Sequence, residues 1–190
     1  MSNSNEIKSS RTRMLTEGGI CIAMAIALSY IKIPIGLSFG GFGGSIDLVM
    51  VPLVVFALKC GAKWGCLAGF IFGTLKYFLA SGFAVSWVSI IFDYSIAYAA
   101  VGLAGLMAVK DSAPGTKRSA VGALIGCVAR FIIHFISGVT VYAQYMPEEF
   151  ASPSLYSLFY NGTYMLPNTI LCVLVVLLLA KPLRSIYLAK

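Results

Sequence analysis

Charged residues are scarce in this chain. Only 11% of its 190 residues are Asp, Glu, Lys or Arg, whereas a soluble domain carries about 25%. Hydrophobic residues make up 59% of the chain, which exceeds the roughly 45–50% typical of soluble domains. This balance excludes an ordinary soluble protein and predicts one polytopic membrane domain over residues 1–190.

Motifs for catalysis and metal binding are also missing. The sequence contains no Walker motif and no His-Glu-x-x-His zinc motif. Its five cysteines occur singly in or beside apolar runs, as small packing residues do. We therefore expect no enzyme activity, no ATP hydrolysis, no cofactor, no metal site and no disulfide.

Long apolar runs are what the sequence does contain. A membrane helix needs about 20 mostly apolar residues. Six runs approach that length, at roughly 15–31, 46–58, 64–80, 86–109, 119–142 and 155–180. The second run is short, and we expect its helix to begin earlier. The predicted fold class is an all-α membrane protein, a bundle of six transmembrane helices.

The net charge of +7 follows the membrane topology and does not indicate a nucleic-acid partner. Cations gather before the first span, after the second, after the fourth and after the sixth: Lys8, Arg11, Arg13, Lys59, Lys63, Lys110, Lys117, Arg118, Lys181, Arg184 and Lys190. The opposite side has Lys32 together with Glu148 and Glu149. The positive-inside rule then places both termini and the tail, residues 1–13, in the cytoplasm. We expect the cell membrane, a bacterial plasma membrane, as the location.

The outer loop at residues 32–46 is rich in glycine, with five glycines between Gly36 and Gly44. Glycine permits unusual backbone angles and motion. The segment is interpreted as a lid over a binding site, with a plain reverse connection as the alternative.

Arg130 and the chain's only histidine, His134, lie within the fifth span. A helix advances about 100° per residue, so polar and small residues share one stripe: Arg130, His134, Ser137, Gly138, Val141, Tyr142 and Tyr145. Charge inside a membrane is costly and faces a partner or a cavity. An internal ion pair would explain the stripe, but polar groups on other spans favour a substrate cavity.

These other groups lie in the same outward half of the membrane. Asp93 and Tyr94 belong to the fourth span, and Tyr156 and Asn161 to the sixth. Carboxylates accept hydrogen bonds from amino groups, and aromatic faces stack on rings and attract cations. The set predicts a site for a small, polar aromatic heterocycle.

The first span carries a ridge of small residues, Gly19, Ala23 and Ala27. Small residues four apart let another helix approach closely. The ridge predicts either a docking face for a partner or packing within the bundle.

Three segments resemble the thiamine-specific S components of energy-coupling-factor (ECF) vitamin transporters: "LTEGGICIAMAIALSYI", "IDLVMVPLVVFALKCGAKWGCLAGFIFG" and "RFIIHFISGVTVYAQY" with the later "YSLFYNG". The resemblance covers about residues 14–180. It implies a six-helix bundle that binds thiamine with high affinity near the outer face, under a lid between the first two helices. It also implies docking, through small residues of the first helix, onto a transmembrane T component with two cytoplasmic ATPases, which together form an ABC-type importer.

The resemblance also implies which residues bind the ligand. His134, Gly138, Tyr94, Tyr156 and Asn161 match the family's ligand-contacting pattern.

Five further positions keep the chemical type but change the residue. Asp93 and Asp47 stand where the family typically has Glu, Arg130 where it has Lys, and Tyr142 and Phe72 where it has Trp. The ligand is therefore interpreted as thiamine, with a thiamine precursor, analogue or phosphate ester as alternatives.

Two other functional classes are compatible with the polar residues. One is a solitary proton-coupled carrier in which Asp93 and His134 relay protons, and the other is a membrane enzyme that uses the same two residues. The size of the bundle and the ridge weigh against the carrier, and the missing catalytic motifs weigh against the enzyme.

Overall fold

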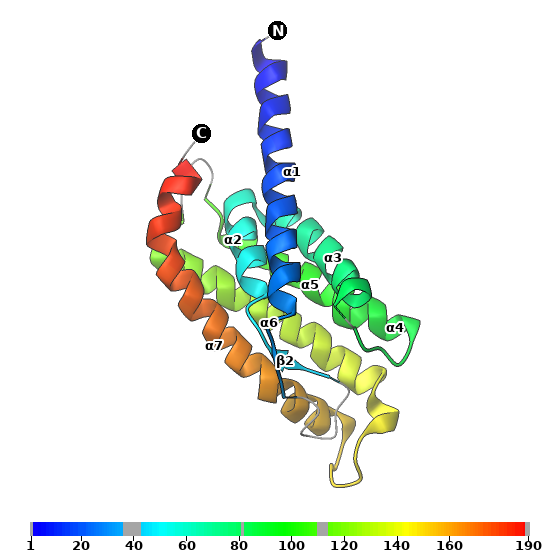
Figure 1. Ribbon diagram of the computed structural model, residues 1–190. Helices are drawn as coiled ribbons and strands as arrows, with labels where there is room; N and C mark the ends of the chain where they lie inside the picture. Colours follow the sequence, from blue (N-terminus) through cyan, green and yellow to red (C-terminus); the bar gives the residue numbers. More distant parts are fainter. Residues whose placement is uncertain (1, 36–42, 81, 110–113, 189–190) are drawn as a thin grey trace.

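Helices dominate the molecule (Figure 1). The computed structural model describes the backbone of residues 2–35, 43–80, 82–109 and 114–188, and the side chains of these residues from 11 to 182. The single helices are α1 (Ser2–Ser29), α2 (Met50–Cys60), α3 (Ala62–Leu79), α6 (Thr116–Thr140) and α7 (Pro153–Leu188). A composite helix runs through α4 (Trp87–Ser89), the π-helical η2 (Ile90–Ile96), α5 (Ala97–Val101) and the 3-10 turn η3 (Gly102–Met107).

Among the described residues, four helices are long and apolar enough to cross a membrane. These stretches are Arg11–Ser29, Trp87–Met107, Thr116–Thr140 and Pro153–Pro182. They support the prediction of an all-α, multi-pass membrane protein. Helix α2 has 11 residues and measures about 16 Å, about half of the roughly 30 Å apolar core of a bilayer.

The expectation that the second helix begins earlier is wrong for the described residues. Ser45–Ile46 form strand β2, which pairs antiparallel with β1 (Ile33–Pro34), and helix α2 begins only at Met50. The side-chain amide of Asn168 on α7 explains why helix α2 begins later than expected. It accepts a hydrogen bond from the Asp47 N–H at 2.9 Å and donates one to the Ser45 carbonyl at 2.7 Å, which holds the chain extended. Residues 36–42 of the predicted lid lie outside the described residues.

Glycines bring α3 into close contact with the composite helix. Gly69 and Gly73 are four residues apart, and an added Cβ would lie 2.0 Å from the Tyr98 carbonyl oxygen and 2.2 Å from the Tyr94 carbonyl oxygen. Neither position therefore accepts a side chain without moving the helices. This contact fixes the helix that carries Asp93, Tyr94 and Tyr98.

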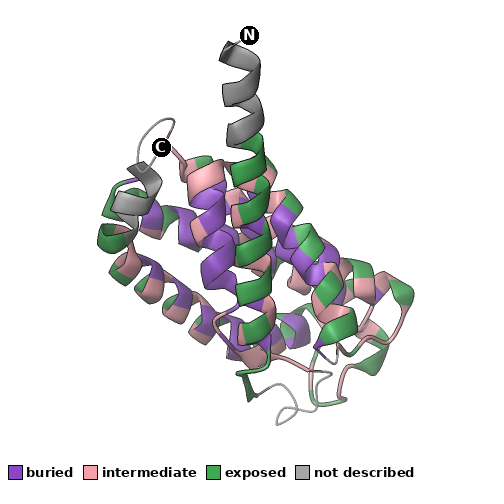
Figure 2. Cartoon of the chain, turned by 45° about the horizontal axis from the view of Figure 1, so that its top comes forward, coloured by how far each residue is buried: buried purple, intermediate pink, exposed green. Residues whose placement is uncertain are grey.

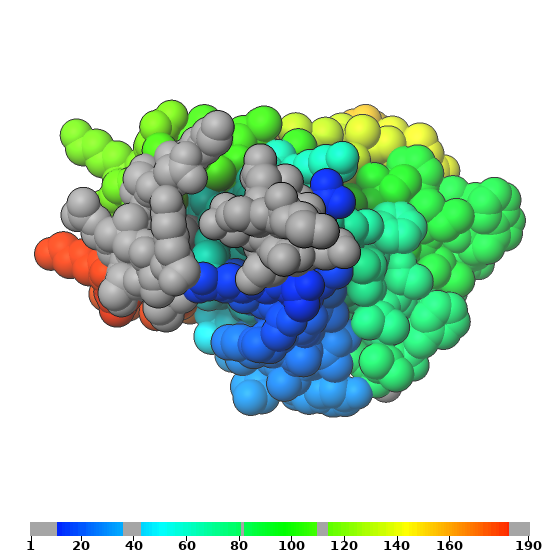
Figure 3. All heavy atoms as spheres, turned by 90° about the horizontal axis from the view of Figure 1, so that it is seen from above, coloured from blue at the N-terminus to red at the C-terminus, as the bar shows by residue number. Residues whose placement is uncertain are grey.

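The buried residues gather between the helices, and exposed residues cover the outside of the bundle (Figure 2). Many exposed side chains are large and apolar, such as Leu15, Met24 and Phe78, as expected for a surface that meets lipid. Viewed along the bundle, α1 occupies one edge of the molecule beside α3 (Figure 3).

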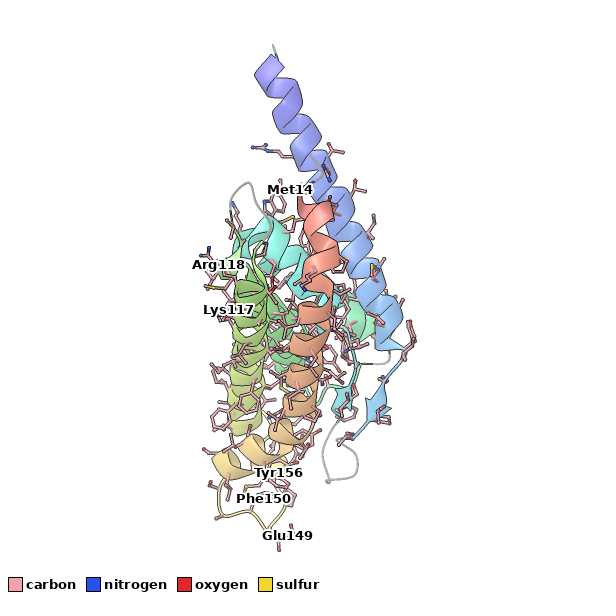
Figure 4. The ribbon with its side chains drawn as sticks, turned by 90° about the vertical axis from the view of Figure 1, so that its left-hand side faces the viewer. Met14, Lys117, Arg118, Glu149, Phe150 and Tyr156 are labelled. Atoms are coloured by element: carbon pink, nitrogen blue, oxygen red, sulfur yellow. The ribbon has the colours of Figure 1, made fainter. Side chains whose placement is uncertain are left out.

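The two ends of the bundle differ in charge. The beginning of α1 and the end of α7 lie at the same end of the molecule (Figure 1). Lys117 and Arg118 lie toward that end, whereas Glu149 and Tyr156 lie at the opposite one (Figure 4). Helix α1 has 28 residues and begins at Ser2, so the predicted polar tail continues the first helix.

Candidate ligand-binding site

A cavity of about 460 Å³ lies among η2, α5, α6, α7 and the residues beside β1 and β2. Eight of the ten predicted ligand-binding residues line it: Asp93, Tyr94, Arg130, His134, Gly138, Tyr142, Tyr156 and Asn161. Helices α6 and α7 pack side by side and supply most of these eight (Figures 1 and 4). Four residues of the polar stripe on the fifth span, Arg130, His134, Gly138 and Tyr142, therefore face the cavity.

Asp93 and His134 meet across the cavity wall. Nδ1 of His134 lies 3.4 Å from Oδ1 of Asp93. When the ring is neutral with its proton on Nδ1, Nε2 is a hydrogen-bond acceptor. Within the described residues, Nε2 is buried and has no partner. A ligand donor can satisfy it, while Asp93 accepts from the same ligand.

The π-helical turn η2 positions Asp93 and Tyr94. Such turns are rare and occur frequently at functional sites. Tyr94 is tied to the preceding loop, because its hydroxyl accepts from the Phe83 N–H at 2.8 Å and donates to the Phe83 carbonyl at 2.9 Å. Residue spacing in the sequence does not reveal a π turn, so this feature was not predicted.

Arg130 lies deep in the cavity and is only 6% exposed. Its Nη2 donates to the Tyr98 hydroxyl at 3.0 Å, and its Cζ lies 4.2 Å from the centroid of the Tyr98 ring. Lys76 also reaches the Tyr98 hydroxyl, at 2.6 Å, and lines the cavity. We call Lys76, Tyr98 and Arg130 the cavity floor.

Asp47 and Phe72, the other two predicted ligand-binding residues, lie behind the floor and outside the described cavity lining. Oδ2 of Asp47 lies 3.4 Å from Nζ of Lys76. The Phe72 ring is fully buried and packs edge-on against Tyr98, with the ring centroids 4.7 Å apart. In this structure both residues support groups that line the cavity.

Helices α6 and α7 approach each other closely at Gly138, beside the cavity. An added Cβ would lie 2.2 Å from Oγ of Ser157. Asn161 follows Ser157 by one turn, and its side-chain amide donates to the Ser157 carbonyl at 2.9 Å. Its Oδ1 accepts a hydrogen bond from the Tyr164 hydroxyl at 2.6 Å. The absence of a side chain at Gly138 thus lets α7 bring Asn161 to the cavity.

Tyrosines form much of the remaining wall. Tyr156, Tyr160 and Tyr164 line the cavity at four-residue spacing on α7, and the rings of Tyr156 and Tyr160 are stacked with centroids 5.7 Å apart. Tyr142 lies beyond the end of α6, where burial and the nearby Asp93 carboxylate raise the pKa of its phenol. The phenol therefore stays neutral at physiological pH.

The lining also includes Lys76, Tyr98, Tyr160 and Tyr164, which were not among the ten predicted ligand-binding residues. The four-residue spacing of the tyrosines on α7, and of Tyr98 after Tyr94, was a usable signal for three of them, because such residues share one helix face. The intramembrane charge of Lys76 was the signal for the fourth.

The end of the glycine-rich loop rests on this wall. The Tyr160 hydroxyl donates a hydrogen bond to the Gly43 carbonyl. Gly44 has φ +97°, and a Cβ there would lie 2.7 Å from the Tyr164 ring. The described part of the loop therefore covers the cavity at α7.

The predicted docking ridge is exposed. Gly19, Ala23 and Ala27 all lie on the outer surface of α1, and nothing within 4 Å would meet a Cβ at Gly19. The neighbouring Gly18 instead faces Phe56 of α2. Packing within the described bundle thus uses the other side of α1.

Comparisons with known proteins identify the family. Residues 15–188 match the family described as thiamine transporter protein (Thia_YuaJ). The chain belongs to this thiamine transporter family. Its members are transporters, which confirms the prediction that the chain is not an enzyme.

Curated relatives agree with this assignment. The thiamine transporter ThiT of Bacillus subtilis is 34% identical over 146 residues, covering 72% of this chain and 75% of the relative. ThiT of Lacticaseibacillus paracasei is 30% identical over 188 residues, covering 93% and 91%. A solved structure of ThiT from Listeria monocytogenes has a TM-score of 0.80 at 24% identity, over 94% of this chain and 98% of that one, and supports the same fold.

Proposed function

We propose that this transporter-family chain binds thiamine with high affinity in the cavity between η2, α6 and α7. The observation that carries the proposal is the convergence of Asp93, His134 and Asn161 with tyrosine rings in one largely buried space. Thiamine presents an aminopyrimidine, whose amino group suits a carboxylate, and a cationic thiazolium ring, which suits tyrosine faces. The names of the curated relatives support the same ligand.

Mass spectrometry of small molecules retained by the purified protein tests this proposal. We expect thiamine to co-purify and to bind with a Kd in the nanomolar range or below, measured by calorimetry after it has been removed. A pyrimidine precursor and a thiazole precursor, each titrated separately, should bind far more weakly because each reaches only part of the cavity. Tighter binding of a precursor than of thiamine would overturn the assignment.

We further propose that the chain is the S component of an ECF-type importer. It has no Walker motif, so uptake driven by ATP requires partners, a transmembrane T component and two cytoplasmic ATPases. The exposed ridge of Gly19, Ala23 and Ala27 supplies a face for docking the T component. Co-purification with ATPases tests the partnership. Uptake by the chain alone in proteoliposomes, driven by a proton gradient, would instead indicate a solitary carrier.

The proposed topology has six membrane crossings with both termini in the cytoplasm of a bacterial cell. Lys117 and Arg118 then face the cytoplasm and Glu149 faces outward, in line with the positive-inside rule. Residues 32–46 act as the lid over an outward-facing cavity. Single cysteines at positions 117 and 149, in a variant without the native cysteines, test the orientation with an impermeant thiol reagent. Only the cysteine at position 149 should react in intact cells.

A further inference from the structure

Two of the five cysteines meet in the core of the bundle. Cys127 on α6 and Cys172 on α7 are both buried, and their side chains are in hydrogen-bond contact with each other. The expectation of no metal site followed from cysteines that occur singly along the chain. Packing of α6 against α7 brings these two together, which the spacing in the sequence did not indicate.

A third sulfur atom lies beside this pair. The Cys127 thiol donates to the thioether of Met50 on α2, with 3.9 Å between Sγ and Sδ. Met50 is buried as well. A thiolate binds a metal ion such as zinc at about 2.3 Å, so two sulfurs that share one ion in a trigonal plane lie about 4 Å apart. The separation of Cys127 from Met50 fits such a site. We call Met50, Cys127 and Cys172 the sulfur cluster.

The donor atoms of the sulfur cluster select the kind of metal. Structural zinc takes four ligands from cysteine, histidine and carboxylate side chains. The described part of the chain has no group of three or more His, Cys, Asp or Glu side chains that could hold a metal ion. Thiolate and thioether ligands instead favour soft ions such as copper(I). Two thiolates and one thioether therefore suit a three-coordinate copper(I) ion.

The charge of an occupied cluster has a partner nearby. Copper(I) on two thiolates carries one net negative charge, which is costly in an apolar core unless it is paired. Arg130 follows Cys127 by three residues, on the same face of α6, and interacts electrostatically with it. Among the described residues, no carboxylate forms an ion pair with Arg130. Its guanidinium can therefore neutralise the occupied cluster.

We propose that Met50, Cys127 and Cys172 form a copper(I) site that joins α2, α6 and α7. On binding, copper(I) forms bonds to the two thiolates and to the thioether, the two thiols give up their protons to water, and no oxidation state changes. The three ligands lie outside the residues that line the ligand cavity, so the site does not depend on the proposed function. Since each helix supplies one ligand, bound copper stabilises the folded bundle.

A copper titration on a protein with fewer cysteines tests the site. Cys21, Cys60 and Cys66 are only partly buried and are replaced by serine, which leaves the cluster as the remaining thiols. This full-length protein, reduced and kept without oxygen in detergent, is titrated with copper(I) against the chelator bicinchoninate. We expect one copper per chain and a higher melting temperature. X-ray absorption should show a shell of three sulfur neighbours.

Substitutions in the same background identify the ligands. Cys127→Ala and Cys172→Ala should each abolish binding of one copper per chain. Met50→Leu keeps the size of the side chain and should weaken binding more than about 10-fold, the smallest loss typical even of outer-shell partners. Met107→Leu is the matched control, because Met107 packs against the same core but is not a ligand, and it should leave the affinity unchanged. If an alanine variant fails to fold, Met50→Leu and the absorption spectrum carry the test.

Three results would overturn the copper site. The first is a folded protein that retains no copper in competition with bicinchoninate. The second is a melting temperature that falls with copper, which would mean that the metal binds the unfolded chain. The third is unchanged affinity in Met50→Leu, or a spectrum without a third sulfur. Thiamine titrated into the copper-free protein checks the proposed function separately.

Discussion

Nδ1 of His134 lies 3.4 Å from Oδ1 of Asp93, which joins α6 to the π-helical turn η2 across the cavity wall. Within the described residues, the pair leaves Nε2 of His134 without a partner. The pair thus presents one carboxylate and one imidazole acceptor toward the ligand from two different helices. A ligand group that donates two hydrogen bonds, such as the amino group of an aminopyrimidine, can then bind both helices at once.

Asp93→Asn keeps the size of the side chain but removes its charge. We expect thiamine affinity to fall by about 2–3 kcal/mol, or roughly 30–150-fold, because a charge-assisted contact is lost in a buried site. Isothermal titration measures the change. Asp93→Glu is the matched control and should bind more tightly than Asp93→Asn. Unchanged affinity in Asp93→Asn would exclude a direct contact.

Tyr142 is proposed to stack on the ligand. Tyr142→Ala should weaken thiamine binding strongly, whereas Tyr142→Trp should be tolerated or should tighten binding, since a larger aromatic face is retained. Calorimetry on both variants provides the comparison. Equal losses would show that Tyr142 is a packing residue.

The hydrogen bond from Tyr160 to the Gly43 carbonyl is expected to hold the loop over the bound ligand. Tyr160→Phe keeps the stacking on Tyr156 but removes the hydroxyl. Thiamine should dissociate about 5–10-fold faster, which corresponds to the loss of one hydrogen bond, while its association rate changes little. Stopped-flow exchange of labelled thiamine measures both rates. A slower association with unchanged dissociation would contradict a role in closure.

Gly138 and Ser157 form a pair that can be tested by compensation. Gly138→Ala places a methyl group against Oγ of Ser157, and overpacking of this kind costs about 1–3 kcal/mol. The melting temperature and thiamine affinity should both fall. Removing the opposing side chain with Ser157→Gly should restore part of both in the double variant. No restoration would mean that Gly138 acts on the ligand by another route.

Substitutions in the ridge on α1 are expected to abolish transport while leaving ligand binding intact. Gly19→Trp combined with Ala23→Trp should leave thiamine binding by the isolated protein intact, because the ridge is exposed and its residues do not line the cavity. Uptake in cells with the complete importer should be lost, since bulky side chains block close helix approach. Normal uptake by this variant would refute the docking role. A melting curve controls for misfolding.

The amino-acid sequence by itself determined the membrane class, the approximate bounds of the helices and the polar stripe of α6. Each of these depends on residues near one another in the chain, where helical periodicity and apolar length are sufficient. For this reason the sequence alone places Arg130, His134, Gly138 and Tyr142 on one face. The four-residue spacing on α7 carries the same kind of signal for Tyr160 and Tyr164, although neither was among the predicted ligand-binding residues.

Only the tertiary structure decided which helix faces meet and how far each helix is shifted along its axis relative to its neighbours. Asp47 and Phe72 were expected at the ligand, but they lie behind Lys76 and Tyr98. The position of Phe72 depends on the rotation and shift of α3 against α5, which the close contacts at Gly69 and Gly73 set. Asp47 is instead placed by the hydrogen bond from its N–H to the side chain of Asn168 on α7. Such contacts join residues far apart in the chain, and their geometry follows from three-dimensional packing, which local periodicity does not encode. The floor formed by Lys76, Tyr98 and Arg130 takes one residue each from α3, α5 and α6, so it exists only through that packing.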